Sequence, residues 1–361
     1  MIGRTGRCAA PSRHTRRGMQ AILPVTIPFF ALVLLGYLAA RLRVLPASAI
    51  PGLNAYVLYF ALPCMLFRFG AGMPFSTLID PVLIGCYALC AVLIVGLTVA
   101  LTCKRRHRSD GVDLKDAAFG AFVAAFPNSG FMGVPLLVGL LGNAAAGPVI
   151  GTLLVDLFLT STLCLALAQS GHDRDRQPCG PTGAAAAGSL SAAAAVLRPL
   201  RGAISNPQPW AIALGAGAGA LDLALPGPAA QVIRMLGDSA SPVALFTIGA
   251  VLWRAGQHAH TKTPLARYLP LAVIKLWVHP LLVGATGLAA RALGLPVSGF
   301  GLTVLVLAAA LPSASGVSLL AERFGADNGR VARVIMASTA LAFVSFTLIA
   351  SALEGAGWWH R

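Results

Sequence analysis

Charged residues are scarce in this sequence. They make up 11% of 361 residues, and only 12 of them are Asp or Glu, whereas soluble domains carry about 25% charged residues. This scarcity excludes an ordinary soluble protein. Hydrophobic residues account for 57% of the chain and the mean hydropathy is +0.78. The composition therefore indicates an integral membrane protein made of α-helices.

The motifs of common enzyme classes are also missing. The sequence has no Walker phosphate loop, no Gly-x-Ser-x-Gly elbow, no His-Glu-x-x-His and no pair of catalytic carboxylates. It has seven cysteines, but no two have metal-ligand spacing with a histidine partner. We therefore expect neither an enzyme nor a bound cofactor or metal, and no transport driven by ATP.

What the chain has in abundance is long apolar segments. Most approach the roughly 20 residues that a membrane helix needs. The ten predicted spans are residues 22–40, 48–67, 81–102, 117–141, 147–168, 208–225, 229–253, 265–290, 299–321 and 331–352. No segment outside these spans is long enough to bury a core of its own.

The net charge of +15 is unevenly distributed among the connections between spans. Most Lys and Arg fall in the connections that follow odd-numbered spans, as in the run Lys104-Arg105-Arg106. By the positive-inside rule these connections are cytoplasmic and both termini lie outside, in the periplasm. The charge thus predicts orientation in an inner membrane, and we expect no nucleic-acid partner.

The N-terminal tail, residues 1–18, conflicts with that rule because it is rich in arginine on the predicted outer side. A true basic tail, a targeting segment and translation from Met19 would each explain it, and we favour Met19. The remaining predicted organisation is a first five-helix repeat at 19–169, a cytoplasmic linker at 170–206 and a second repeat at 207–361.

The two repeats are predicted from three collinear matches. Residues 28–36 resemble 207–215, and 63–70 resemble 242–249, both at an offset of 179, while Pro127 resembles Pro312. Each repeat holds an odd number of spans, so the second must enter the membrane from the opposite face. The predicted architecture is therefore an inverted repeat of five plus five helices.

The fourth and ninth spans carry helix breakers and small polar residues. They are Pro127, Asn128, Ser129, Gly130 and Pro135 in the fourth span, and Pro312, Ser313 and Ser315 in the ninth. Broken helices at matching places in two halves indicate a transporter's substrate site, and the restarted half-helix suits an anion. We expect the two breaks to cross, with Asn128 facing Ser313. The alternative is that proline and serine merely kink two packed helices.

Four ionisable residues lie inside predicted spans: Asp156, Asp238, Lys275 and His279. Buried charges in a membrane usually have partners, so we expect Lys275 to pair with Asp156, or with Asp238 as a second candidate. Such a pair could couple transport to protons, or it could be static. Asp238 could instead cap a helix, and His279 could be a packed, hydrogen-bonded histidine. Arg68, at the end of a span, is expected to snorkel to the interface.

These residues together resemble the auxin efflux carrier family, including its bacterial malonate-transporter-like members. The resemblance is carried by Phe126–Pro135, by Tyr59–Pro63, by Gly237-Asp238, and by Lys275 with His279-Pro280. It implies ten helices with two crossed, broken ones, and a carboxylate substrate held by the fourth-span and ninth-span residues. Plant members usually have asparagine in the second crossover, where this chain has Ser313, so small organic acids are favoured over an indole-acetate-like substrate. It also implies that Lys275 could take the place of a sodium ion.

The sequence therefore predicts a secondary active transporter of a small organic anion, such as malonate or another mono- or dicarboxylate, working by alternating access. Coupling to protons or Na⁺ stays open, as does a homodimer in the lipid bilayer. The alternatives are a cation/proton antiporter that uses Asp156 and a channel or membrane-embedded sensor.

Overall fold

The computed structural model describes residues 13–103, 112–175, 197, 199–258 and 263–358. In these residues the chain is helical and has no β-strand, only two isolated β-bridges. Predictions for residues 1–12 and for most of the linker, 176–196 and 198, lie outside the described residues. The helix α1 already begins at Arg13, inside the segment that the sequence sets apart as a tail.

The helices are α1 (Arg13–Arg41), α2 (Ile50–Tyr56), α3 (Leu62–Ala71), α4 (Phe75–Leu78), α5 (Pro81–Thr102), α6 (Leu114–Ala125), α7 (Val134–Leu141), α8 (Ala146–Val155), α9 (Ser161–Asp175), α11 (Pro207–Ala220), α12 (Gly227–His258), α13 (Leu265–Val273), α14 (His279–Ala292), α15 (Gly299–Ala309), α16 (Gly316–Arg323) and α17 (Asn328–Gly355). Short 3-10 turns η1 (Ala47–Ala49) and η4 (Asn143–Ala145) precede α2 and α8. Wider π-helical turns continue other helices at η2 (Val57–Ala61), η3 (Ser129–Gly133), η5 (Asp156–Thr160) and η6 (Ile274–Val278).

Seven helical segments in the described part of the chain are long and apolar enough to cross a membrane. They are Ile22–Arg41, Ala47–Ala71, Pro81–Thr102, Asn143–Ser170, Gly227–Gln257, Leu265–Ala292 and Asn328–Gly355. The other three predicted spans, 117–141, 208–225 and 299–321, contain no single helix of that length, because two are interrupted and α11 has 14 residues. The structure thus supports a multi-pass membrane protein, while the count of ten stays a prediction.

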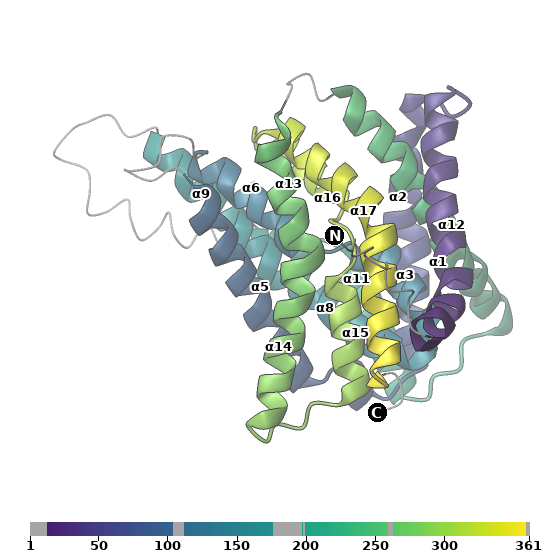
Figure 1. Ribbon diagram of the computed structural model, residues 1–361. Helices are drawn as coiled ribbons and strands as arrows, with labels where there is room; N and C mark the ends of the chain where they lie inside the picture. The colour runs from purple at the N-terminus through teal and green to yellow at the C-terminus, as the bar shows by residue number, and fades with distance from the viewer. Residues whose placement is uncertain (1–12, 104–111, 176–196, 198, 259–262, 359–361) are drawn as a thin grey trace, which may run out of the picture.

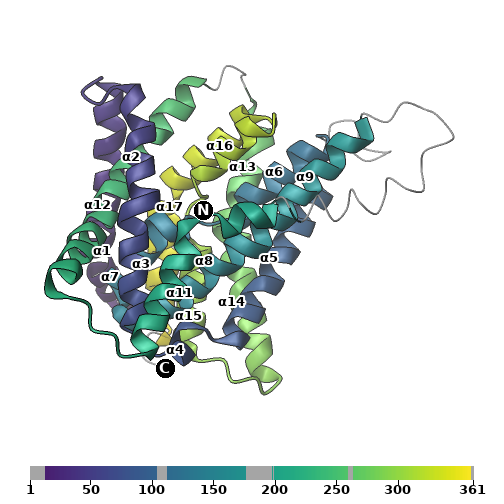
Figure 2. The ribbon, with the colours of Figure 1, turned by 180° about the vertical axis from the view of Figure 1, so that it is seen from behind.

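The helices form two groups that α17 joins (Figures 1 and 2). In one group α12 packs along α1 and α3, and α11 packs along α3. In the other, α5 packs against α6 and α14, and α14 packs against α15. α17 contacts both α1 and α13. We call the end of the bundle where α1 and α12 end the basic face; the C-terminal end of α17 lies at the opposite face (Figure 1).

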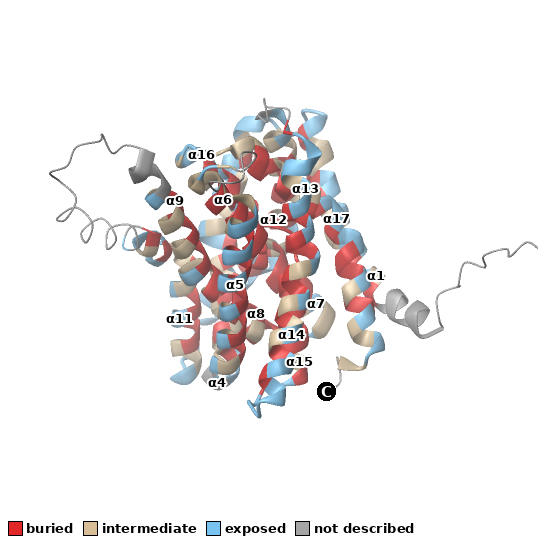
Figure 3. Cartoon of the chain, turned by 60° about the vertical axis from the view of Figure 1, so that its left-hand side comes forward, coloured by how far each residue is buried: buried red, intermediate tan, exposed pale blue. Residues whose placement is uncertain are grey.

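The two short helices α6 and α15 lie in the centre of the bundle. Every residue of 117–125 in α6 is buried, and so is every residue of 301–309 in α15 (Figure 3). A helix that is apolar and buried on all sides is surrounded by other helices rather than by lipid. The ends of both helices therefore meet inside the protein, where broken backbone can be tolerated.

Glycines allow the closest helix contacts in the first group. A Cβ atom on Gly36 of α1 would overlap the carbonyl oxygen of Phe246 of α12, and one on Gly215 of α11 would overlap that of Phe67 of α3. Gly215 lies 179 positions after Gly36, and Phe67 lies 179 positions before Phe246. The second contact therefore repeats the first with the two halves of the chain exchanged. Two further contacts, Gly249 with Val33 and Gly70 with Ile212, are related in the same way.

Candidate functional site

The candidate site begins where the helical hydrogen bonding of two central segments stops. α6 ends at Ala125 and helical structure resumes at Ser129, while α15 ends at Ala309 and resumes at Gly316. The amide of Asn128 donates to the carbonyl of Pro312 at 2.8 Å, and the amide of Ala314 donates to the carbonyl of Phe126 at 3.1 Å. The two irregular stretches thus satisfy each other's backbone groups through a short antiparallel bridge.

Two polar side chains at this bridge are buried. Asn128 is 3% exposed and Ser129 is 1% exposed. The Asn128 side chain makes no cap hydrogen bond to η3, and within the described residues the Ser129 hydroxyl oxygen is buried without a partner. Polar groups buried without partners are costly, so their persistence here points to a ligand. The first N–H groups of η3 also lack intrahelical partners, as at any helix start, whereas α7 continues η3 and its first amide, that of Val134, donates to the carbonyl of Ser129.

Ser313 differs from the expectation that it mirrors Asn128. Its hydroxyl donates to the carbonyl of Val123 at 2.6 Å, which satisfies one of the last carbonyls of α6. Its amide donates to Ser338 of α17 at 3.2 Å, and the Ser338 hydroxyl lies 3.2 Å from the Ser313 hydroxyl. Ser313 therefore holds the bridge together, and its hydroxyl proton is committed to the protein.

Ser315 and Gly130 are the remaining small residues predicted for the site. Ser315 is buried, and it lines a cavity on the basic face. Gly130 faces a residue that the sequence reasoning missed, since a Cβ on Gly130 would lie 3.6 Å from the amide nitrogen of Gln208. Gln208 is buried at the start of α11. A glutamine between two prolines at the head of an apolar span was the available signal.

The Lys275 side chain, from η6, contacts the C-terminal end of α15, next to the interruption of that span. The fully buried Lys275 Nζ donates to the carbonyl of Ala309 at 2.8 Å and lies 3.2 Å from His279 Nδ1. A cation at the carboxyl end of a helix is stabilised by unsatisfied carbonyls. His279 is also fully buried, and its Nε2 atom has no partner within the described residues.

Asp156 and Lys275 interact electrostatically at a distance rather than in contact. In the described part of the chain no direct ion pair joins them. The Asp156 carboxylate instead accepts hydrogen bonds from the Tyr87 hydroxyl at 3.1 Å and from the Thr160 hydroxyl at 3.2 Å. The Tyr87 and His279 rings have centroids 5.8 Å apart. Asp156 and Lys275 both lie in π-helical turns, which are frequent at functional sites.

Asp238 is paired with Arg68, and this corrects two expectations. The Arg68 guanidinium donates to the Asp238 carboxylate at 2.5 Å. Asp238 lies in the middle of α12, so it caps no helix end and is not the partner of Lys275. The pair joins α3 to α12.

The N-terminal end of α6 is hydrogen-bonded to the segment between α16 and α17. The amide of Asp327 donates to the Asp116 carboxylate at 2.8 Å, and Lys115 Nζ donates to the carbonyl of Gly325 at 2.6 Å. Burial raises the pKa of the Asp116 carboxyl above its ordinary value, and the hydrogen bond from Asp327 acts against that rise. The two interrupted segments are therefore connected at this end as well as at the bridge.

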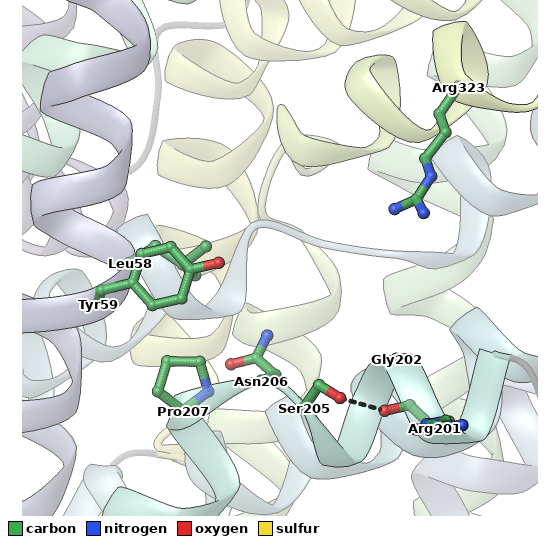
Figure 4. A pocket seen from close by; sticks show the side chains of 8 residues that line it. All are labelled: Leu58, Tyr59, Arg201, Gly202, Ser205, Asn206, Pro207 and Arg323. Carbon is green, nitrogen blue, oxygen red and sulfur yellow. Dashed lines mark hydrogen bonds between the residues drawn. The ribbon is translucent and has the colours of Figure 1, made fainter.

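Cavities lie in both halves of the bundle. A cavity of about 530 Å³ on the side of the basic face is lined by α2, α12 and α16 and includes Ser315 and Gly316. A cavity of about 470 Å³ in the opposite half is lined by α3, α7 and α12 and includes Pro135. A third cavity, of about 490 Å³, is lined by Leu58 and Tyr59, which also line the 530 Å³ cavity (Figure 4). Its other lining residues are Arg201, Gly202, Ser205, Asn206, Pro207 and Arg323.

Comparison with known proteins identifies what this chain is similar to. A profile of the family described as "Membrane transport protein" matches residues 21–350. The chain is 28% identical over 338 residues to a Rhizobium meliloti (strain 1021) protein named "Putative malonate transporter", covering 91% of this chain and 95% of that protein. It is 27% identical over 323 residues to an "Uncharacterized transporter" of Methanothermobacter thermautotrophicus, covering 88% and 93%.

Proposed function

Since the chain belongs to the family of membrane transport proteins, which confirms its resemblance to the auxin efflux carriers, we propose that it is a secondary active transporter of a small organic anion. The name of the Rhizobium relative makes malonate or another mono- or dicarboxylate the first candidate. The observation that carries the proposal is the pair of buried polar side chains at the bridge between two interrupted helices, the Asn128 side-chain amide and the unpartnered Ser129 hydroxyl.

A carboxylate fits the donors that surround the bridge. The start of η3 presents backbone N–H groups and the positive end of a helix dipole, both of which favour an anion. The Asn128 side chain would donate from the same segment, and Gln208 would donate from α11. Ser313 would hold the bridge in shape rather than contact the anion. The site would therefore be asymmetric between its two halves.

We also propose that the membrane fold is a ten-span inverted repeat, with α6–α7 and α15–α16 as the two interrupted spans. The glycine contacts support this, because Gly36 with Phe246 and Gly215 with Phe67 exchange places at a constant offset. The surplus of Lys and Arg supports a cytoplasmic location for the basic face, in an inner membrane with both termini outside.

Alternating access would then move the bridge between the two cavities. The interrupted segments are linked to each other at the bridge and again through Asp116 and Asp327. The group of α1, α3, α11 and α12 is held together by its own glycine contacts. We propose that these two bodies shift relative to each other, so that the site opens first to one cavity and then to the other.

Substitution of Lys275 tests whether this residue is needed for uptake or serves only to balance the charge of Asp156. Lys275→Ala removes the donor to Ala309 and leaves a buried carbonyl unsatisfied, so uptake should fall to background. Because Asp156 bonds to Tyr87 and Thr160 instead, the double variant Lys275→Ala/Asp156→Asn should not regain uptake. Uptake by reconstituted vesicles measures this. Recovery in the double variant would show that Lys275 serves to balance the charge of Asp156.

Counterflow in proteoliposomes tests the proposed function. Vesicles loaded with unlabelled malonate should accumulate labelled malonate transiently, and imposed proton or Na⁺ gradients should show which ion, if either, drives uptake. A channel would give flux without counterflow. Cation/proton exchange that ignores every organic anion tested, and that is lost in Asp156→Asn, would favour the antiporter alternative.

A further inference from the structure

Arg68 and Asp238 form an ion pair that the proposed transport cycle does not yet use. Arg68 Nη1 lies 2.5 Å from Asp238 Oδ1 and 3.4 Å from the carbonyl oxygen of Arg234. Both charged residues line the 470 Å³ cavity in the half of the bundle opposite the basic face. A guanidinium held by a carboxylate at the wall of a cavity is a ready binding group for a second carboxylate.

The pair is accessible rather than sealed in the core. The Arg68 side chain is 42% exposed and that of Asp238 is 64% exposed. Exposed ion pairs contribute little to stability, so another carboxylate can replace Asp238 at small cost. Gly237 keeps the space open, because a Cβ at that position would lie 3.3 Å from Arg68 Nη1.

The cavity that holds this pair is also lined by the helix that follows the bridge. One of its walls is α7, the helix that continues η3, and includes Pro135, Val138 and Gly139. Pro135 is six residues after Ser129, which corresponds to about 9 Å along a helix. An anion held at Arg68 would therefore lie on the route from this face to the donors at Asn128 and Ser129.

We propose that Arg68 is an anion-binding residue of the entrance opposite the basic face, where it takes a carboxylate of the transported anion. Asp238 occupies the guanidinium when no anion is present and competes with the incoming substrate. This inference rests on the proposed function, since it requires that the cargo is a carboxylate. Arg68 and Asp238 then have opposite effects on apparent affinity, although they form one ion pair.

The test is the KM for malonate added to the Arg68 side of reconstituted vesicles. Arg68→Gln should raise KM about tenfold or more, the loss expected for a charge-assisted hydrogen bond. Asp238→Asn should lower KM several-fold, because it removes the competitor. Arg234→Gln, which removes a positive charge one helical turn away, should change KM less than twofold. The maximal rate should change little in all three variants.

Several outcomes would overturn the inference while leaving the proposed function intact. An unchanged KM in Arg68→Gln is one. Parallel losses in both single variants that the double variant Arg68→Gln/Asp238→Asn reverses would assign the pair to a structural brace. If Arg68→Gln does not fold, Asp238→Asn still decides, since an unchanged or raised KM contradicts competition. Absence of counterflow in wild-type vesicles would instead remove the proposed function, and this inference with it.

Discussion

Asn128→Ala is expected to reduce anion uptake to background while the protein remains folded. Asn128 is 3% exposed, and its side chain makes no cap hydrogen bond that the substitution would remove. Its removal should therefore leave the thermal midpoint within a few degrees of wild type. The proposed substrate contact disappears, and because a hydrogen bond to a charged group is lost, transport should fall about 10- to 100-fold. Counterflow and thermal unfolding of the purified protein measure the two effects.

Ser313→Ala is the matched control, and it should give the reverse pattern. It removes the hydroxyl that donates to Val123 and contacts Ser338, leaving a buried carbonyl unsatisfied. We expect a lower thermal midpoint, with the residual folded protein keeping a near-normal KM. Wild-type uptake by Asn128→Ala would remove the bridge from consideration as the substrate site. A large rise of KM in Ser313→Ala would restore it as a substrate contact.

Gly215→Ala is expected to destabilise the fold strongly. The added Cβ would overlap the backbone carbonyl of Phe67, and backbone cannot rotate aside as a side chain can. Overpacking of this kind costs about 3 kcal/mol, which should appear as a large drop in thermal midpoint and in the yield of monodisperse protein. Gly36→Ala should match it, because its Cβ would overlap the carbonyl of Phe246 in the counterpart contact.

Gly217→Ala provides the control on the same helix. Gly217 lies two residues further along α11, and a Cβ there would have no atom within 4 Å. Helix propensity alone favours alanine by roughly 0.5 to 1 kcal/mol, so this variant should be as stable as wild type or slightly more so. Equal stability of the Gly215 and Gly217 variants would contradict the close helix contact on which the repeat argument relies.

The charged residues show where prediction from sequence failed. Scarcity of charge in apolar spans correctly singled out Asp238 and Lys275 as residues in need of partners. The partner of Asp238 was predicted wrongly, because Asp238 meets Arg68, 170 positions away. Lys275 donates to a backbone carbonyl and interacts with Asp156 only at a distance. Which charges meet depends on how helices are rotated about their axes and at what depth they cross. Neither quantity can be read from hydropathy.

The serines and the glutamine show the same limit within the candidate site. Ser313 matches Asn128 by its place in the repeat, yet its hydroxyl bonds to Val123. Gln208 faces Gly130 although nothing in the spacing of the sequence connects them. Small polar residues near a helix interruption can serve either the backbone or a ligand. The choice depends on which carbonyl lies within hydrogen-bond distance, and that is set by a neighbouring segment.

Sequence alone determined that this is a helical membrane transporter of its family, because composition, hydropathy and the motif at 126–135 are properties of the chain itself. It also located the residues at which helical hydrogen bonding is interrupted, since Pro127 and Pro312 have no N–H to donate. Tertiary structure decided the rest. The bridge at residues 126–128, the Arg68–Asp238 pair and the cavities on either side all join segments more than 50 residues apart. Contacts of that kind form only when the helices pack against one another. The sequence around one residue therefore does not reveal which distant residue it will contact.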